Sequence, residues 1–133
     1  LDASLRTRFA ALPAERLNVI STHDAFGYFT QAYGLRFVPV RGLFTESEPS
    51  ARDIARLVEQ IRRERISSIF IENISDPRLL EQLARETGAT MGGKLYSDAL
   101  SLVGGSAPTY IDMMETNAAT LLGALQGDGK PSR

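Results

Sequence analysis

Short apolar stretches alternate with amphipathic helical patterns along almost the whole of this 133-residue chain. The apolar stretches have the length of buried strands, and between them hydrophobic residues recur every three or four positions, as on one face of a helix. This alternation predicts an α/β fold, a single lobe with a four-stranded parallel sheet flanked by helices on both faces. The expected strands are residues 17–20, 37–40, 66–71 and, more weakly patterned, 90–95.

Capping residues indicate where the helices begin and end. Ser50, with Asp53 three residues later, resembles a capping box and predicts a helix that starts directly after Ser50. Asp76 is expected to be the N-cap of another helix, with Pro77 in its first position and Gly88 at its end. Further helical patterns lie in the opening segment before Pro13, from Ala25 to Gly34, and after Pro108.

Composition excludes several classes of function. With 15 Lys and Arg against 16 Asp and Glu, the chain has no general attraction for nucleic acid, and no apolar stretch approaches the roughly 20 residues of a membrane span. The chain has no cysteine, so a bound metal must use histidine, carboxylates or water. The Gly, Asp, Pro and Ser of residues 127–133 predict a flexible tail.

Polar side chains follow three of the expected strands. His23 comes after the first, Glu72 directly after the third and Asp98 after the fourth. Because the carboxyl ends of parallel strands meet at one edge of the sheet, these side chains are expected at a common rim. An imidazole with carboxylates, and no thiol, suits a divalent transition metal such as zinc or manganese.

Each of these residues also has an ordinary structural interpretation. His23 could be a hydrogen-bonded loop residue, Glu72 could accept backbone hydrogen bonds, and Asp98 could cap a short turn. Asp24 is expected to cap the helix that starts at Ala25. A small metal-assisted hydrolase is a further alternative, with His23 and Asp98 holding the ion and Glu72 as the base.

Several short strings resemble one family, the zinc- and manganese-specific substrate-binding proteins of bacterial ABC transporters. The resemblance covers most of residues 1–125, in the same order along the chain. The strings are THDAFGYF (22–29), AYGL (32–35), FIEN (70–73), LYSDAL (95–100) and YIDMMETN (110–117).

The resemblance implies two α/β lobes joined by a long helix, with the metal held in the cleft between them. This chain resembles the C-terminal lobe alone, over residues 1–126, with residues 1–11 as the end of the linking helix. The N-terminal lobe, which supplies two further histidines in the family, is then missing. The implied protein is not an enzyme. It is periplasmic or otherwise extracytoplasmic, its leader is not in this chain, and it delivers its metal to an ABC permease.

The resemblance also implies which residues bind the metal. His23 and Asp98 correspond to family ligands, and Glu72 lies at a familiar acidic position beside the site. Some relatives have Glu in place of this histidine, a pattern associated with manganese, so His23 favours Zn²⁺ and leaves a manganese or iron carrier as the alternative. Zinc takes about four ligands, so we expect the isolated lobe, with two, to bind the metal weakly or not at all.

Overall fold

The computed structural model describes residues 1–21, 25–38, 49–73 and 76–127. Within these residues no helix is both long and apolar enough to cross a membrane. One turn of 3-10 helix, Ala14–Arg16, was not predicted. The described α-helices are α1 (Asp2–Ala10), α2 (Gly27–Tyr33), α3 (Ala51–Arg63), α4 (Arg78–Thr87) and α5 (Tyr110–Gln126). The described strands are β1 (Asn18–Ile20), β2 (Arg36–Val38), β3 (Ser68–Glu72) and β4 (Thr90–Leu95).

The four described strands form one parallel sheet in the order β2-β1-β3-β4. In the register, Ile20 lies beside Ile69, and Glu72 lies beside Leu95 at the ends of β3 and β4. The predicted α/β fold with a four-stranded parallel sheet is therefore confirmed. The carboxyl ends of β3 and β4 are level with one another, so the residues that follow them start from the same edge.

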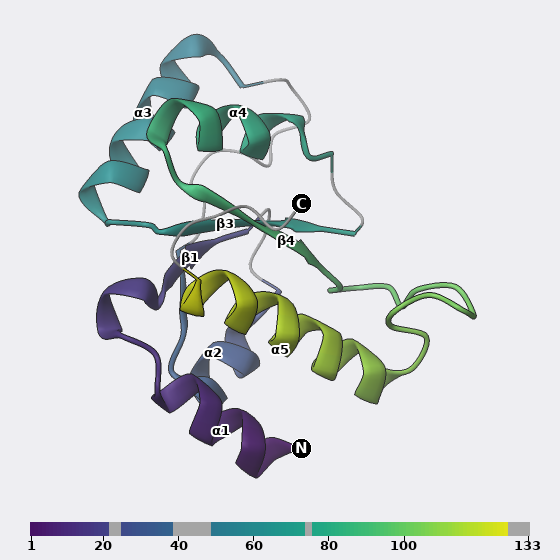
Figure 1. Cartoon of the computed structure of the whole chain (residues 1–133). Coiled ribbons are helices and arrows are strands. Elements are labelled where there is room, and N and C mark those ends of the chain that lie inside the picture. Colours follow the sequence, from purple (N-terminus) through teal and green to yellow (C-terminus); the bar gives the residue numbers. More distant parts are fainter. Residues whose placement is uncertain (22–24, 39–48, 74–75, 128–133) are drawn as a thin grey trace.

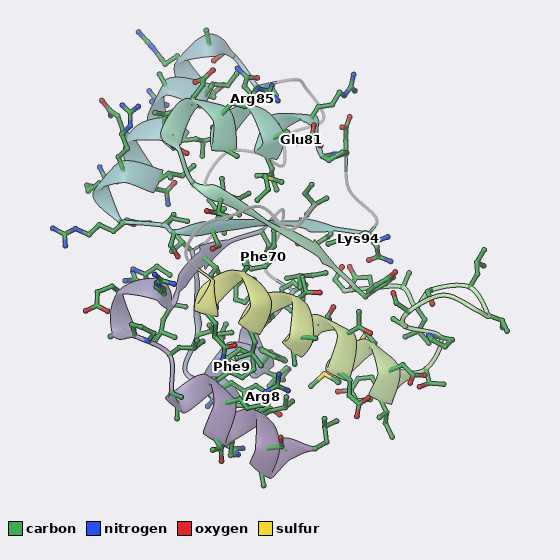
Figure 2. All side chains as sticks on the ribbon, in the orientation of Figure 1. Arg8, Phe9, Phe70, Glu81, Arg85 and Lys94 are labelled. Atoms are coloured by element: carbon green, nitrogen blue, oxygen red, sulfur yellow. The ribbon has the colours of Figure 1, made fainter. Side chains whose placement is uncertain are left out.

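Helices cover both faces of the sheet, as predicted (Figure 1). On one face α3 and α4 pack through Leu57, Ile61, Leu80 and Leu83 over Ile69. On the other face α1, α2 and α5 enclose a second core. Figure 2 shows two of its aromatic residues, Phe9 on α1 and Phe70 on β3, each at most 1% exposed.

Most element boundaries agree with the sequence signals, and a few differ. Helix α2 begins at Gly27 rather than Ala25, and the expected cap, Asp24, lies outside the described residues. Helix α4 begins at Arg78, one residue later than expected, although the Asp76 carboxylate does accept a hydrogen bond from the Arg78 N–H at 3.0 Å. Strand β2 begins at Arg36, one residue earlier than expected, and residues 39–40 of the predicted strand lie outside the described residues.

The capping box at the start of α3 is confirmed. Ser50 Oγ accepts a hydrogen bond from the Asp53 N–H at 3.2 Å. The Ser50 hydroxyl and N–H both donate to the Asp53 carboxylate, at 2.6 and 2.9 Å. These two bonds, the hydroxyl bond first, lower the pKa of Asp53 from its ordinary value.

Replacing Ser50 with alanine is expected to lower the free energy of unfolding by about 1 kcal/mol, because the Asp53 amide loses its acceptor. The pKa of the Asp53 carboxyl should rise back toward its ordinary value. A lowered carboxyl pKa stabilises the fold above the unfolded-state pKa, and this stabilisation is lost as the pH falls through the folded-state value. Urea unfolding should therefore give a smaller difference from wild type in acid than at neutral pH, and an equal difference would contradict the electrostatic part.

Candidate metal-binding edge

Strands β3 and β4 deliver their following loops to the same edge of the sheet. Glu72 is the last residue of β3 and pairs with Leu95, the last residue of β4. Beyond this pair, the Asn73 N–H donates to the Leu95 carbonyl oxygen at 2.9 Å. The ends of β3 and β4 therefore lie side by side. This places Glu72 and the loop that contains Asp98 at one edge of the sheet, as predicted.

The side chain of Asn73 holds the backbone on both sides of Asp98. Its Oδ1 accepts a hydrogen bond from the Ser97 N–H at 3.3 Å, and its Nδ2 donates to the Ala99 carbonyl oxygen at 3.1 Å. Asp98 itself is exposed, and residues 97–98 form a bend rather than the start of a helix. The structure thus places Asp98, as an exposed residue, on a loop that is tied to the end of β3.

A second asparagine holds the start of the same loop. Asn117, on α5, is 3% exposed. Its Oδ1 accepts from the Tyr96 N–H and its Nδ2 donates to the Tyr96 carbonyl oxygen, both at 2.8 Å. The amide therefore binds Tyr96 as a neighbouring strand would, just where β4 ends.

Tyr96 also carries the one pKa shift close to this loop among the described residues. Its phenol shares a hydrogen bond with Ser106 Oγ at 3.2 Å, and the Lys94 ammonium lies 5.2 Å from its ring centroid. The hydrogen bond with Ser106 and then the Lys94 charge lower the pKa of Tyr96 from its ordinary value, against the opposing effect of burial. The ring is thus fixed beside the candidate edge from two sides.

The predicted site residues differ in how far the structure describes them. Glu72 is 1% exposed, whereas Asp98 is exposed at the same edge. His23 lies outside the described residues, as does Asp24. Among the residues that the structure does describe, no three histidine, cysteine, aspartate or glutamate side chains are grouped closely enough to hold an ion. The ligand set of His23 and Asp98 therefore stays a prediction.

Several large apolar side chains are exposed on the helices and the loop near this edge. Tyr28 on α2 and Tyr110 on α5 are 92% and 67% exposed, and Leu102 and Val103, shortly after Asp98, are also almost fully exposed. Between α2 and α5 lies an open hollow of about 360 Å³, lined by Tyr28, Tyr33, Tyr96, Ser97, Tyr110 and Met113 among others.

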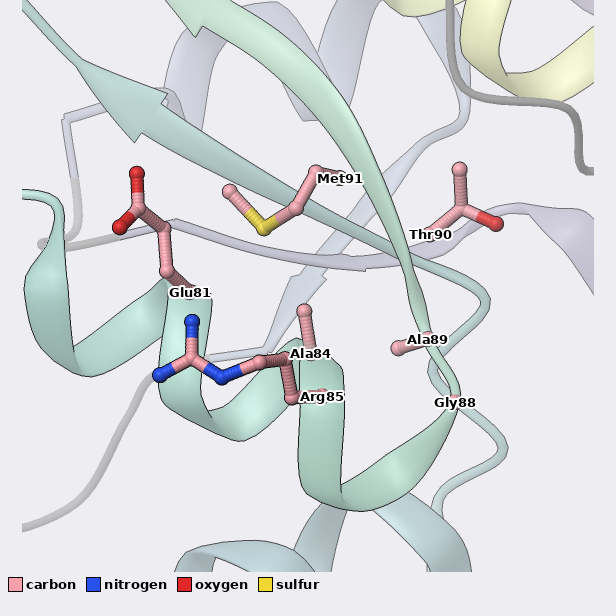
Figure 3. Close-up of a pocket in the computed structure, with 7 residues that line it drawn as sticks. All are labelled: Glu81, Ala84, Arg85, Gly88, Ala89, Thr90 and Met91. Carbon is pink, nitrogen blue, oxygen red and sulfur yellow. The ribbon is translucent and has the colours of Figure 1, made fainter.

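A further hollow, of about 400 Å³, lies away from the edge. It is formed where β4 begins, at Thr90 and Met91, and not where β4 ends. Figure 3 shows Glu81 and Arg85 of α4 on one side of it and Met91 on the other. Because it opens at the opposite end of the strand from Asp98, it does not contribute to the candidate site.

Sequence reasoning missed the roles of Asn73 and Asn117. A signal was available for Asn117, because it is a polar residue directly before Ala118 and three positions after Met114, on the apolar face of the last helical pattern. A polar residue on such a face needs a hydrogen-bond partner in the core. For Asn73 the only local signal was its place directly after a buried strand.

The fold and the edge together define a class: a parallel α/β unit with an exposed aspartate on a loop at the carboxyl edge of its sheet. A profile of the ZnuA family, described as "Zinc-uptake complex component A periplasmic", matches residues 1–124. The chain belongs to this family. The resemblance noted in the sequence is thereby confirmed.

Curated relatives in the family carry names for different metals. The chain is 39% identical over 130 residues to the zinc-binding protein TroA of Treponema pallidum, covering 94% of this chain and 42% of TroA. It is 33% identical over 131 residues to the manganese-binding lipoprotein MntA of Bacillus subtilis, covering 95% of this chain and 43% of MntA. It is 32% identical over 121 residues to the iron-binding protein YfeA of Yersinia pestis, covering 91% of this chain and 39% of YfeA.

Similar solved structures are also periplasmic metal-binding proteins. The periplasmic zinc-binding protein TroA of Treponema pallidum matches with a TM-score of 0.78 and 37% identity, over 93% of this chain and 47% of that chain. A manganese-bound mutant of the periplasmic metal-binding protein from Candidatus Liberibacter asiaticus matches with a TM-score of 0.79 and 28% identity, over 92% and 46%. The chain thus spans less than half the length of the relatives it matches.

Proposed function

We propose that this chain is the C-terminal lobe of an extracytoplasmic solute-binding protein that captures a divalent transition metal, with zinc favoured, and delivers it to an ABC permease. His23 and Asp98 are the proposed ligands, and Glu72 lies beside them. The observation that carries the proposal is the loop from Tyr96 to Ala99, which presents Asp98 at the sheet edge in a chain of this family.

The register is consistent with His23 and Glu72 belonging to one site. Ile20 pairs with Ile69, and His23 is three positions after Ile20 in the sequence, as Glu72 is three positions after Ile69. His23 and Asp98 would supply about half of the four ligands that zinc takes. A preceding lobe would supply the others, and opening the cleft would then remove half of the coordination shell at once.

Two exposed tyrosines support a two-lobed protein. Tyr28 and Tyr110, both strongly exposed, line the hollow beside Ser97, and a preceding lobe docked there would cover them. Residues 1–11, which include α1, are proposed as the end of the linking helix on the family resemblance, and Leu5 and Phe9, 2% and 1% exposed, anchor α1 in the core of this lobe.

Zinc is favoured for two reasons. An imidazole from His23 suits zinc better than it suits manganese, and TroA, 39% identical to this chain, is named a zinc-binding protein. A manganese or iron carrier is the alternative within the family, in line with the names of MntA and YfeA.

Competition titration of the full-length protein that carries this lobe tests the proposal and the choice of metal. We expect tight zinc binding in the wild type and, in His23→Glu, a ratio of zinc affinity to manganese affinity at least tenfold lower, because a carboxylate favours manganese. Failure of the wild type to bind zinc, manganese or iron would reject the function. An unchanged ratio would reject His23 as the group that selects zinc.

The hydrolase alternative gains no support from the geometry. It requires Glu72 to act as a base toward a substrate that enters from solvent, and Glu72 is 1% exposed. The curated relatives are also named for metal binding and transport rather than for a reaction.

A further inference from the structure

Two asparagine side chains hold the loop that carries Asp98, and they hold it by its backbone. Asn117 pairs with both backbone groups of Tyr96 at 2.8 Å, and Asn73 bonds to Ser97 and Ala99 at 3.3 and 3.1 Å. Asp98 is the one residue between the two backbone groups that Asn73 binds. We infer that Asn73, supported by Asn117, is a positioning residue that sets the direction of the Asp98 carboxylate toward the metal; this inference rests on the proposed function.

The chemistry of the two bonds explains why an amide stands at position 73. The Ser97 N–H needs an acceptor and the Ala99 carbonyl oxygen needs a donor, and a primary amide supplies both from one planar group. An aspartate could accept but not donate, and an aliphatic side chain could do neither. Asn73 is in turn fixed by its own backbone, because its N–H donates to Leu95 at the end of β4.

The position of Asp98 makes its backbone important. Asp98 is exposed, so the loop backbone, which places its Cα atom, determines where its side chain starts. Groups that orient a metal ligand typically account for a 10- to 100-fold difference in metal affinity. Loss of the two Asn73 bonds should therefore weaken metal binding more than it weakens the fold.

The test is zinc binding by the full-length protein with Asn73→Leu, which keeps the approximate size of the side chain and removes both hydrogen bonds. We expect the zinc Kd, measured by competition with a chromophoric chelator, to rise at least tenfold. The visible absorption of the Co²⁺-loaded protein should also change, because the ligand geometry around the ion is altered. If Asn73→Leu does not fold, Asn73→Ser, whose shorter side chain replaces the amide with a hydroxyl, should still raise the zinc Kd above that of wild type, and an unchanged Kd would overturn the positioning role.

Asn18→Leu is the matched control. Asn18 is also half-buried and its Nδ2 donates to the Glu64 carbonyl oxygen at 3.1 Å, but it lies at the start of β1, the opposite end of the strand from the carboxyl edge. Asn18→Leu should lower the Tm by a similar amount and leave the zinc Kd and the Co²⁺ spectrum unchanged.

The outcomes separate this inference from the proposed function. If wild type binds zinc and Asp98→Ala loses it, while Asn73→Leu retains the wild-type Kd within twofold, the positioning role is wrong and the function stands. The positioning role is equally wrong if Asn18→Leu weakens zinc binding as much as Asn73→Leu does, because the effect would then be general destabilisation. A wild type that binds no metal overturns both.

Discussion

Replacing Asp98 with alanine in the full-length protein is expected to weaken zinc binding at least tenfold, or by about 1.4 kcal/mol. The proposed shell has about four ligands, and the variant removes the only carboxylate among those assigned to this lobe. His23→Ala should have an effect of the same size, because it removes the only imidazole that the lobe contains. Isothermal titration calorimetry with zinc measures both changes.

Asp76→Ala is the control for the loss of a negative charge. Asp76 forms an ion pair with Arg78 at 2.6 Å, and both side chains are exposed. An exposed pair contributes little to stability, and the residue is not a proposed ligand, so its removal should leave zinc affinity within twofold of wild type. If Asp98→Ala also left the affinity within twofold, the assignment of Asp98 as a ligand would be wrong.

Phe70→Ala is expected to lower the free energy of unfolding of this chain by about 3 to 5 kcal/mol. Phe70 is fully buried in the middle of β3 and belongs to the core formed with α1, α2 and α5 (Figure 2). Truncation would leave a cavity between the sheet and α5 that the surrounding elements can fill only in part. Urea unfolding followed by circular dichroism measures the change, and Phe70→Leu serves if the alanine variant does not fold.

Tyr28→Ala provides the contrast for Phe70, because Tyr28 is 92% exposed and its truncation should change the stability of the chain by no more than about 0.5 kcal/mol. A loss for Phe70→Ala no larger than that of Tyr28→Ala would contradict the buried position of the Phe70 ring.

The same ring explains the glycine at position 92 of β4. A Cβ atom added to Gly92 would lie 2.3 Å from Phe70 Cε1, far inside contact distance. Gly92→Ala alone should therefore destabilise the chain by about 1 to 3 kcal/mol through overpacking. In the Phe70→Ala background this cost should largely disappear, and strictly additive effects would contradict the packing.

Signals that span only a few residues were sufficient for most of the fold. The capping box of Ser50 and Asp53 involves positions three apart. The glycines that end α2 and α4, Gly34 and Gly88, have left-handed φ angles of 76° and 74°. These features were predictable because the physics is local: one side chain bonds a nearby amide, or one residue adopts a conformation that favours glycine. The start of α4 differs from the prediction by one residue, and there Pro77 already has nearly helical backbone angles.

The candidate site also has one part that the sequence pattern predicts and one part that it does not. Placement of Glu72 and Asp98 at one edge followed from two strands being parallel, which the alternating pattern predicts. The amide bonds that hold the Asp98 loop were not predictable, because Asn73 and Ala99 are 26 positions apart and Asn117 and Tyr96 are 21 apart. Nothing in a local pattern states which distant backbone group a polar side chain will meet.

By itself, the amino-acid sequence determined the order of helices and strands, the parallel sheet and the family, because periodicity, capping residues and short motifs are properties of neighbouring positions. Only the tertiary structure decided that β1 lies between β2 and β3, that Glu72 is buried while Asp98 is exposed at the same edge, and that two asparagines hold the loop between β4 and α5. These features depend on which segments pack together, and hydrogen bonds between distant residues form only once the core has brought their backbones within reach.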